Sequence, residues 1–191
     1  MITAILLAAG QSKRIPKENK LIKKFKSKLL INHILSSLIK SSVNEIIIVL
    51  GFEHLKVKKE LLKNKKIKLV INKNYKKGIA TSIKVGLKKI SKNNKGFLIV
   101  QGDMPKINKT LINKIILSIN NSDKEIFLPK FKDKIGNPIG FKQSMIKKIK
   151  RIKGDIGAKN IIKKNNNKIK FININSKSIL INFNKKRDFL H

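Results

Sequence analysis

The chain of 191 residues contains no cysteine, which excludes a disulfide framework, a zinc ribbon and a thiol nucleophile. Long hydrophobic runs are also missing, since none approaches the roughly 20 residues needed to cross a bilayer. The apolar run at residues 2–9 has no basic segment before it, as a signal peptide would have. The sequence therefore predicts a cytoplasmic protein with no membrane partner.

Acidic residues, arginine and aromatic residues are scarce. Ten Asp and Glu stand against 46 Lys and Arg, which gives a formal net charge of +36, a value typical of proteins that bind nucleic acid or anionic membranes. Yet only three arginines occur, tryptophan is absent and tyrosine occurs once, although nucleic-acid contacts favour arginine forks and stacked rings. Because the lysines are spread along every segment, we interpret the charge as a solvated surface that also attracts anionic substrates. This interpretation disfavours nucleic acid as a partner.

Apolar runs alternate along the chain with segments in which apolar residues recur at helical spacing. This order is typical of βαβ units and predicts an α/β fold, with a mostly parallel sheet covered by helices on both faces. The length fits one domain, residues 1–191. The predicted strands are residues 5–8, 45–50, 68–71, 97–100, 126–131, 138–141, 169–174 and 178–183; the predicted helices are residues 29–40, 53–62, 79–90, 109–119, 143–151 and 158–164.

The first apolar run ends at Gly10, and a polar, basic loop follows that contains Ser12, Arg14 and Lys20. In an open α/β sheet, ligands bind at the loops that leave the carboxyl ends of the strands. A glycine at such a loop lets the backbone approach phosphate oxygens closely. The sequence therefore predicts a substrate that carries phosphate.

Asp103 follows the predicted strand 97–100 and is flanked by glycine and proline. A carboxylate at this place suits a divalent cation beside a bound phosphate, and it equally suits a turn or helix cap. Gly78 precedes a helix whose first turn holds Thr81 and Ser82. These donors suit an anion or a nucleobase edge, and they also suit ordinary capping.

Two later segments combine glycine with a polar side chain. Asn137 lies in the turn GNPIGF at residues 136–141, which is compatible with a site or with a simple hairpin corner. Asp155 lies in GDIGA at residues 154–158 and is compatible with a site or with a helix N-cap.

The order of these segments resembles that of the MobA-like nucleotidyltransferases, and within them the molybdenum cofactor cytidylyltransferases. The family's LAAG-x-S-x-R loop with a following Asn-Lys is present as LAAGQSKR at residues 7–14 and as Asn19-Lys20. The resemblance covers essentially the whole chain and implies a Rossmann-like, GT-A-like fold of the nucleotide-diphospho-sugar transferase type. The family's G-x-x-x-S, DMP, GNP and GD-x-GA segments reappear at residues 78–82, 103–105, 136–138 and 154–158.

The resemblance also implies roles for individual residues. Arg14 would neutralise the departing pyrophosphate, Lys20 would contact the α-phosphate, and Asp103 would hold Mg²⁺. Asn137 and Asp155 would lie toward the acceptor. The nucleotide-binding residues implied by the resemblance are Leu7, Ala8, Ala9, Gly10, Ser12, Gly78 and Ser82.

The implied reaction is transfer of CMP from CTP to the terminal phosphate of the molybdopterin-type molybdenum cofactor, with release of pyrophosphate. Family members with LAAG tend to use CTP and those with LAGG tend to use GTP, so Ala9 favours CTP. The product would pass to a molybdenum hydroxylase or its chaperone. Two alternatives remain: a related transferase that acts on a sugar phosphate or polyol phosphate, and a non-catalytic binder of anions or nucleic acid.

The chain departs from the family's pattern in two places. After the loop arginine the family usually has Met-Gly or Phe-Gly, whereas this chain has Ile15-Pro16, and proline removes a backbone donor. The family's late D-x-D-T-P segment, which can supply a second metal ligand, is represented by Asn182 and Asn184. An asparagine oxygen can coordinate a metal but brings no charge.

Overall fold

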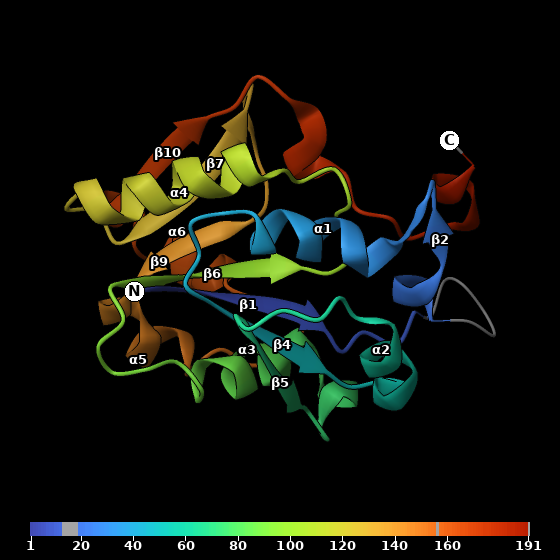
Figure 1. Ribbon diagram of the computed structural model, residues 1–191. Coiled ribbons are helices and arrows are strands. Elements are labelled where there is room, and N and C mark those ends of the chain that lie inside the picture. Colours follow the sequence, from blue (N-terminus) through green and yellow to red (C-terminus); the bar gives the residue numbers. More distant parts are fainter. Residues whose placement is uncertain (13–18, 156, 191) are drawn as a thin grey trace.

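Strand β1 (Ile2–Ala8) lies at the centre of the sheet in the computed structural model, which describes residues 1–12, 19–155 and 157–190 (Figure 1). The strand order is β10-β7-β9-β6-β1-β4-β5, with β8 paired to β7. β9 is antiparallel to both of its neighbours, whereas β1 is parallel to β4 and β6. The predicted α/β fold with a mostly parallel sheet is confirmed. The other strands of this sheet are β4 (Glu45–Leu50), β5 (Ile67–Ile71), β6 (Gly96–Gln101), β7 (Ile126–Phe131), β8 (Lys134–Ile135), β9 (Ile139–Lys142) and β10 (Ile169–Asn173).

Helices cover both faces of the sheet, α1 and α4 on one face and α3 and α5 on the other (Figure 1). Strand β4 shows why both faces must be covered. Ile46 and Ile48 pack into the core under α1 and α4, whereas Ile47 and Val49 pack into the core under α3 and α5. All four side chains are fully buried. A run of consecutive apolar residues is typical of such a doubly covered strand. The helices are α1 (Leu30–Ile39), α2 (His54–Glu60), α3 (Ile79–Leu87), α4 (Lys109–Asn121), α5 (Ile146–Ile149) and α6 (Lys159–Lys163).

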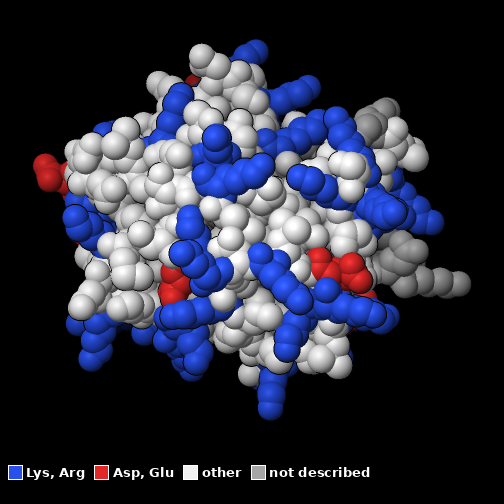
Figure 2. Space-filling model, in the orientation of Figure 1, with Lys and Arg blue, Asp and Glu red and all other residues white. Residues whose placement is uncertain are grey.

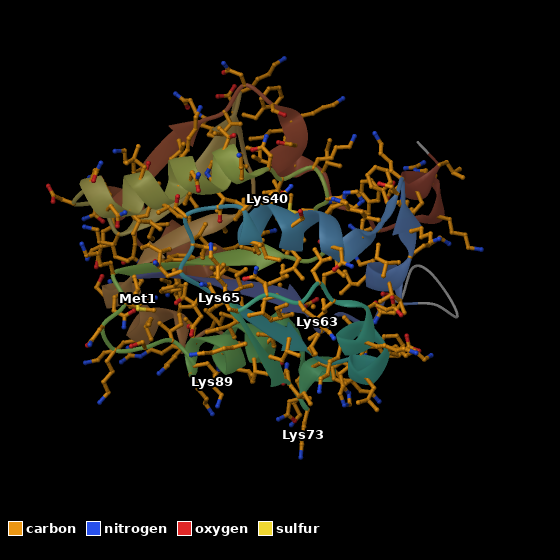
Figure 3. The ribbon with its side chains drawn as sticks, in the orientation of Figure 1. Met1, Lys40, Lys63, Lys65, Lys73 and Lys89 are labelled. Carbon is orange, nitrogen blue, oxygen red and sulfur yellow. The ribbon has the colours of Figure 1, made fainter. Side chains whose placement is uncertain are left out.

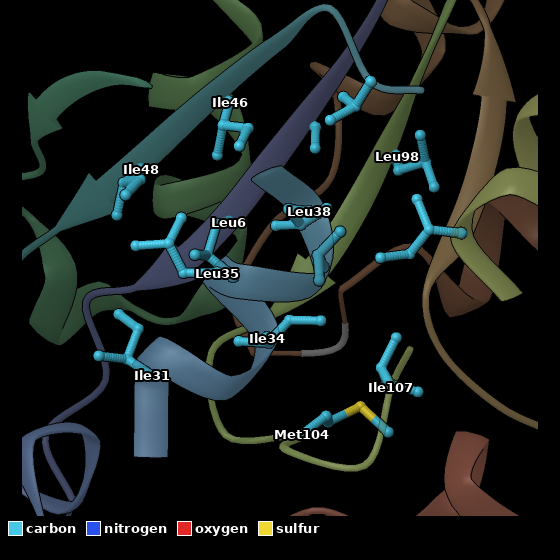
Figure 4. Packing of buried hydrophobic residues seen from close by; sticks show 14 of the residues in the cluster. Leu6, Ile31, Ile34, Leu35, Leu38, Ile46, Ile48, Leu98, Met104 and Ile107 are labelled. Atoms are coloured by element: carbon cyan, nitrogen blue, oxygen red, sulfur yellow. The ribbon is translucent and has the colours of Figure 1, made fainter. Parts of the chain in front are cut away.

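Helix α1 packs its apolar stripe directly over β1 and β4 (Figure 4). Ile34, Leu35 and Leu38 recur at the spacing of one helix face, and none of them is exposed. Met104 and Ile107, which lie one and four residues after Asp103, are buried in the same core. The turn that carries Asp103 is therefore anchored by its own apolar residues.

The chain passes from β1 outward to β4 and β5, and then returns to β6 on the other side of β1. The carboxyl ends of β1 and β6 are therefore neighbours, and the connections that leave them depart in opposite directions. This reversal of strand order is where open α/β sheets bind their ligands. Gly10 follows the first of these strands and Asp103 follows the second.

The predicted strand at residues 178–183 is wrong. Residues Lys177–Leu180 form a 3₁₀ helix, begun by the Ser176 side chain, which accepts a hydrogen bond from the Ser178 amide. Apolar residues of this segment are buried although the segment pairs with no strand: Ile179 and Phe183, for example, are both buried. The predicted helix at residues 143–151 is also shorter than expected, because a 3₁₀ turn at Gln143–Met145 precedes the four residues of α5.

The sequence pattern did not predict a small hairpin of β2 (Lys24–Phe25) and β3 (Lys28–Leu29), which lies between the first loop and α1. Two-residue strands are too short to show an alternating pattern. Within the described residues, no helix combines the length and apolar character needed to cross a membrane.

Candidate active site

A cleft of about 710 Å³ opens at the carboxyl ends of β1 and β6. Its position matches the reversal of strand order, and residues from the first loop and from the Asp103 turn meet in it. Nine of the residues assigned to the site from sequence line this cleft: Leu7, Ala9, Gly10, Ser12, Lys20, Gly78, Ser82, Asp103 and Asp155.

Lys20 and Asp103 form an ion pair at the base of this site, with 2.6 Å between Lys20 Nζ and Asp103 Oδ2. The same ammonium donates to the backbone oxygen of Phe183 at 3.0 Å and to Asn184 Oδ1 at 2.7 Å. A lysine ammonium has three N–H donors, so all three are used. Both charged side chains are largely shielded from water, with 13% and 14% of their side-chain surfaces exposed.

Local hydrogen bonds fix the backbone that carries Lys20. The buried Asn19 caps a 3₁₀ turn at Lys20–Ile22, because its Oδ1 accepts from the Leu21 amide. Its Nδ2 donates to the backbone oxygen of Phe52, and Ser12 Oγ accepts from the Lys20 amide at 3.0 Å. The Asn-Lys pair of the sequence pattern therefore has a structural explanation: the asparagine orients the turn and the lysine reaches the cleft.

One oxygen of Asp103, Oδ1, is buried and has no hydrogen-bond partner in the described part of the chain. Leaving such an oxygen unsatisfied costs about 1–3 kcal/mol, so a ligand that satisfies it gains stabilisation. A hard divalent cation fits this oxygen. Among the described residues, no three His, Asp or Glu side chains gather into a metal cluster, so a metal here would rely on one carboxylate and on substrate phosphates. Magnesium favours such a set of ligands.

The segment after residue 180 reaches the site from the far end of the chain. The Phe183 amide donates to the Asp103 backbone oxygen at 2.9 Å, and the Phe183 ring packs edge-on against Phe25 with 4.6 Å between centroids. Asp188 Oδ2 accepts from the amides of Asn184 and Lys185. Burial raises the pKa of Asp188, but the two amide hydrogen bonds, together with the positive charges of Arg187 and Lys185, lower it by more, so the net shift of the pKa is downward. The carboxylate is therefore charged at neutral pH and holds Asn184 beside Lys20.

Gly78 and the segment around Asp155 form the opposite wall of the cleft. Gly78 has φ +100°, and a Cβ there would lie 2.7 Å from the Gly154 backbone, so the position requires glycine. Asp155 Oδ1 accepts from the Ile79 amide at 2.9 Å, and the Gly154 oxygen accepts from the Ala80 amide. The first amides of α3 are therefore occupied by the protein itself, and Asp155 caps α3 instead of the helix that follows it.

Asn72 was not selected from the sequence. It is 2% exposed and donates to Thr81 Oγ1 and Ser82 Oγ, at 2.8 Å and 2.9 Å. It thereby orients Ser82, which lines the cleft. The signal that could have identified it is the position of this asparagine directly after β5, since the other site residues also follow strands.

Two residues assigned from sequence do not line the cleft, and a third cannot be placed by the described part of the chain. Ala8 is 1% exposed and belongs to the core, and Asn137 is not among the residues that line the cleft. Its amide instead donates to the backbone oxygen of Ile179. Arg14, like Pro16, lies outside the described residues. The functional roles assigned to the site residues remain predictions.

Tyr75, Lys76 and Lys77 also line the cleft, on a 3₁₀ turn just before Gly78. Their segment is adjacent to the small-residue motif, but no role was predicted for them. The two lysines add positive charge to the wall opposite Gly10, where an anionic ligand would benefit from it.

Gly10 offers a test of the loop that does not depend on folding. A Cβ built at Gly10 meets no atom of the described residues within 4 Å, so we expect Gly10→Ala to fold normally. If phosphate oxygens approach this backbone, the added methyl group will obstruct them and raise the KM for the triphosphate by about tenfold. Steady-state kinetics with a thermal unfolding control would measure this; an unchanged KM would contradict phosphate contact at Gly10.

A comparison with known families identifies the domain to which this cleft belongs. Residues 4–169 match the family model described as the MobA-like NTP transferase domain. The matched region contains most of β1, all of β6, Lys20, Asp103 and Asp155, and it ends before Asn184.

Solved structures share the fold across nearly the whole chain. Rv0371c from Mycobacterium tuberculosis H37Rv has 20% identity and a TM-score of 0.87, with 99% of this chain and 95% of that chain covered. Its complex with manganese gives 19% identity, a TM-score of 0.75 and coverages of 91% and 88%. A nucleotidyl transferase from Methanothermobacter thermautotroptrophicus has 18% identity and a TM-score of 0.84, with 100% of this chain and 94% of that chain covered. A 4-diphosphocytidyl-2C-methyl-D-erythritol synthase from Anaerococcus prevotii has 16% identity and a TM-score of 0.77, with 99% of this chain and 92% of that chain covered.

Proposed function

Since the chain belongs to the MobA-like NTP transferase family and is a nucleotidyltransferase, we propose that it transfers CMP from CTP to the terminal phosphate of the molybdopterin-type molybdenum cofactor. The observation that carries the proposal is the pairing of Lys20 with Asp103 in a cleft at the junction of β1 and β6. A cation and a metal-binding carboxylate at this place serve a substrate with several phosphates.

The proposed reaction is an in-line displacement. An oxygen of the acceptor's terminal phosphate attacks the α-phosphorus of CTP, a new P–O–P bond forms, and the bond to the β-phosphate oxygen breaks. Pyrophosphate leaves with the electron pair of that bond. Because no covalent intermediate with the protein is needed, catalysis rests on positioning and on neutralisation of charge.

Individual residues can be assigned to this chemistry. Lys20 would exchange its contacts with Asp103 and Asn184 for the α-phosphate, where negative charge increases in the transition state. The Gly10 backbone would approach the triphosphate, and Ser82, oriented by Asn72, would contact the nucleoside. Arg14 is proposed to neutralise pyrophosphate, and Asn137 and Asp155 are proposed to face the acceptor.

Mg²⁺ is the metal that we propose for Asp103. When held by Asp103, it would neutralise negative charge on the substrate phosphates. The buried, unpartnered Oδ1 of Asp103 supports this proposal from the side of the protein. The manganese complex of Rv0371c shows that a protein of the same fold binds a divalent metal.

The surface charge suits anionic substrates. On the face shown in Figure 2, lysine and arginine side chains are scattered among uncharged ones and do not form a single band. Figure 3 shows that the labelled lysines Lys40, Lys63, Lys65, Lys73 and Lys89 come from helix ends and loops. A field of this kind raises the local concentration of any polyanion, including CTP and the cofactor phosphate.

Ala9 supports cytosine as the base. It lines the cleft while being only 4% exposed, and a side chain at Gly51 would come within 2.7 Å of the Ala9 Cβ. The Ala9 methyl group is therefore packed against the Gly51 backbone beside the cleft, where we propose that it narrows the space for a base.

We expect Ala9→Gly to widen the choice of base. The ratio of kcat/KM for CTP over GTP should fall by about 10- to 100-fold, the range that one methyl group gives in a packed pocket. Competition between the two triphosphates measures this ratio directly. An unchanged ratio would show that Ala9 does not select the base.

A panel of nucleoside triphosphates against candidate acceptors, with pyrophosphate release as the readout, tests the proposed function. Release that requires CTP, a divalent cation and the molybdenum cofactor supports the proposal. Release with a sugar phosphate or polyol phosphate instead identifies the related transferase. No release, together with steeply salt-dependent binding of DNA or RNA, would indicate a non-catalytic binder. If the proposal holds, the dinucleotide product would pass to a molybdenum hydroxylase or its chaperone.

A further inference from the structure

The contacts of Lys20 also bear on how a metal enters the site. Its ammonium lies between Asp103 Oδ2 and Asn184 Oδ1, which are 2.6 Å and 2.7 Å from it, and the Phe183 backbone oxygen takes its third proton. These oxygens are the ligands that a hard cation would use at this place. A side-chain cation therefore occupies the position between them.

The charge of the site strengthens this arrangement. Asp103 contributes one negative charge, and Lys20 balances it with one positive charge. Asn184 adds an oxygen but no charge, and no cluster of three His, Asp or Glu is present in the described ranges. A divalent cation that arrived alone at the unpartnered Asp103 Oδ1 would meet a carboxylate whose charge Lys20 already balances, and it would be repelled by the adjacent ammonium on Oδ2.

We propose that Lys20 prevents free divalent cations from binding to the Asp103 carboxylate, so that a metal binds only together with a nucleoside triphosphate. The triphosphate supplies the missing negative charge and gives the Lys20 ammonium an alternative partner. Asn184 acts here as a positioning residue, because its side-chain oxygen accepts from Lys20 while its backbone amide donates to Asp188 Oδ2. The inference rests on the proposed function, and it specifies the order in which that site is filled.

Binding of Mn²⁺ in the absence of nucleotide tests the proposal, with the free Mn²⁺ signal in electron paramagnetic resonance as the readout. The wild-type protein should show no Asp103-dependent binding below about 1 mM. Lys20→Met removes the competing cation and should tighten binding by about tenfold or more, since a positive charge next to the metal is lost. Mn²⁺ should then also raise the melting temperature of Lys20→Met more than that of the wild type.

Lys77→Met is the matched control, because Lys77 lines the same cleft but lies on its other wall. It removes the same charge and should change Mn²⁺ affinity by less than about threefold, since exposed charges are screened by salt. Lys20→Arg keeps the positive charge and should bind Mn²⁺ as weakly as the wild-type protein does. Where Lys20→Met does not fold, Lys20→Gln, which retains a donor for Asp103, takes its place.

Tight binding of Mn²⁺ to the wild-type protein without nucleotide, lost in Asp103→Asn, would overturn the proposal. Equal affinities of wild type and Lys20→Met would overturn it too. No substrate is turned over in these titrations, so their outcome is separate from that of the transferase assay. A protein that releases no pyrophosphate could still show the Lys20 effect, and an active transferase could lack it.

Discussion

We expect Asp103→Asn to lower metal-dependent pyrophosphate release by about a thousandfold or more. Asp103 provides a carboxylate at the junction of β1 and β6, and its Oδ1 is buried without a partner among the described residues. Asparagine preserves the size of the side chain and removes its charge. The turn itself should survive, because Met104 and Ile107 anchor it in the core.

Asp155→Asn is the control for this experiment. Asp155 is the other carboxylate assigned to the cleft, but its Oδ1 accepts from the Ile79 amide, and an asparagine oxygen can do the same. We expect this variant to keep its dependence on metal. Loss of metal dependence in Asp155→Asn, with full activity in Asp103→Asn, would indicate that the metal binds at Asp155 and not at Asp103.

Lys20→Met is the second variant with a large expected effect. We expect kcat to fall by about 100- to 1,000-fold, because an ammonium that neutralises charge in the transition state is removed. The KM for CTP should change less than kcat, since the interaction is strongest when charge has built up on the α-phosphate. Steady-state kinetics at saturating acceptor measure both quantities.

The same variant should show slow turnover together with tighter binding of Mn²⁺ alone. A merely structural lysine would not produce this combination, because general destabilisation weakens metal binding and activity together. Lys20→Arg should recover part of kcat and lose the gain in Mn²⁺ affinity. Full activity in Lys20→Met would show that the lysine plays no part in the chemistry.

Much of the central sheet could be predicted from the sequence. Residues 45–50 and 126–131 form strands with the predicted bounds, because consecutive apolar, β-branched residues have no other stable place than a doubly covered sheet. The same reasoning failed at residues 178–183. There the apolar residues are buried by the close approach of Gly136 and the Asp103 turn, and a capping serine favours a 3₁₀ turn over strand pairing.

The site was partly predictable for a similar physical reason. The carboxyl ends of parallel strands lie at one edge of the sheet, so residues such as Gly10 and Asp103 could be expected to meet although 93 positions separate them. What local sequence could not reveal is the contact of Lys20 with Phe183 and Asn184. That contact depends on how the segment after β10 returns to the sheet, and its polar residues carry no periodic signal.

Asp155 shows the same limit. A glycine-flanked aspartate before a helix suggests a cap for that helix, but the carboxylate reaches back 76 residues to cap α3. The packing of Gly154 against Gly78 and the hydrogen bond from the Ala80 amide to the Gly154 oxygen bring the two segments together. Asn72 was missed because the hydrogen bonds that give it a function are visible only in three dimensions.

The most direct test of the central claim follows the α-phosphorus of CTP. With CTP labelled at that position, Mg²⁺ and the molybdenum cofactor as acceptor, we expect the label to appear in a phosphatase-resistant dinucleotide, with one pyrophosphate released for each label transferred. Label that stays in CTP or in free CMP, or a γ-phosphate transferred to the acceptor, would contradict nucleotidyl transfer at the cleft of Lys20 and Asp103.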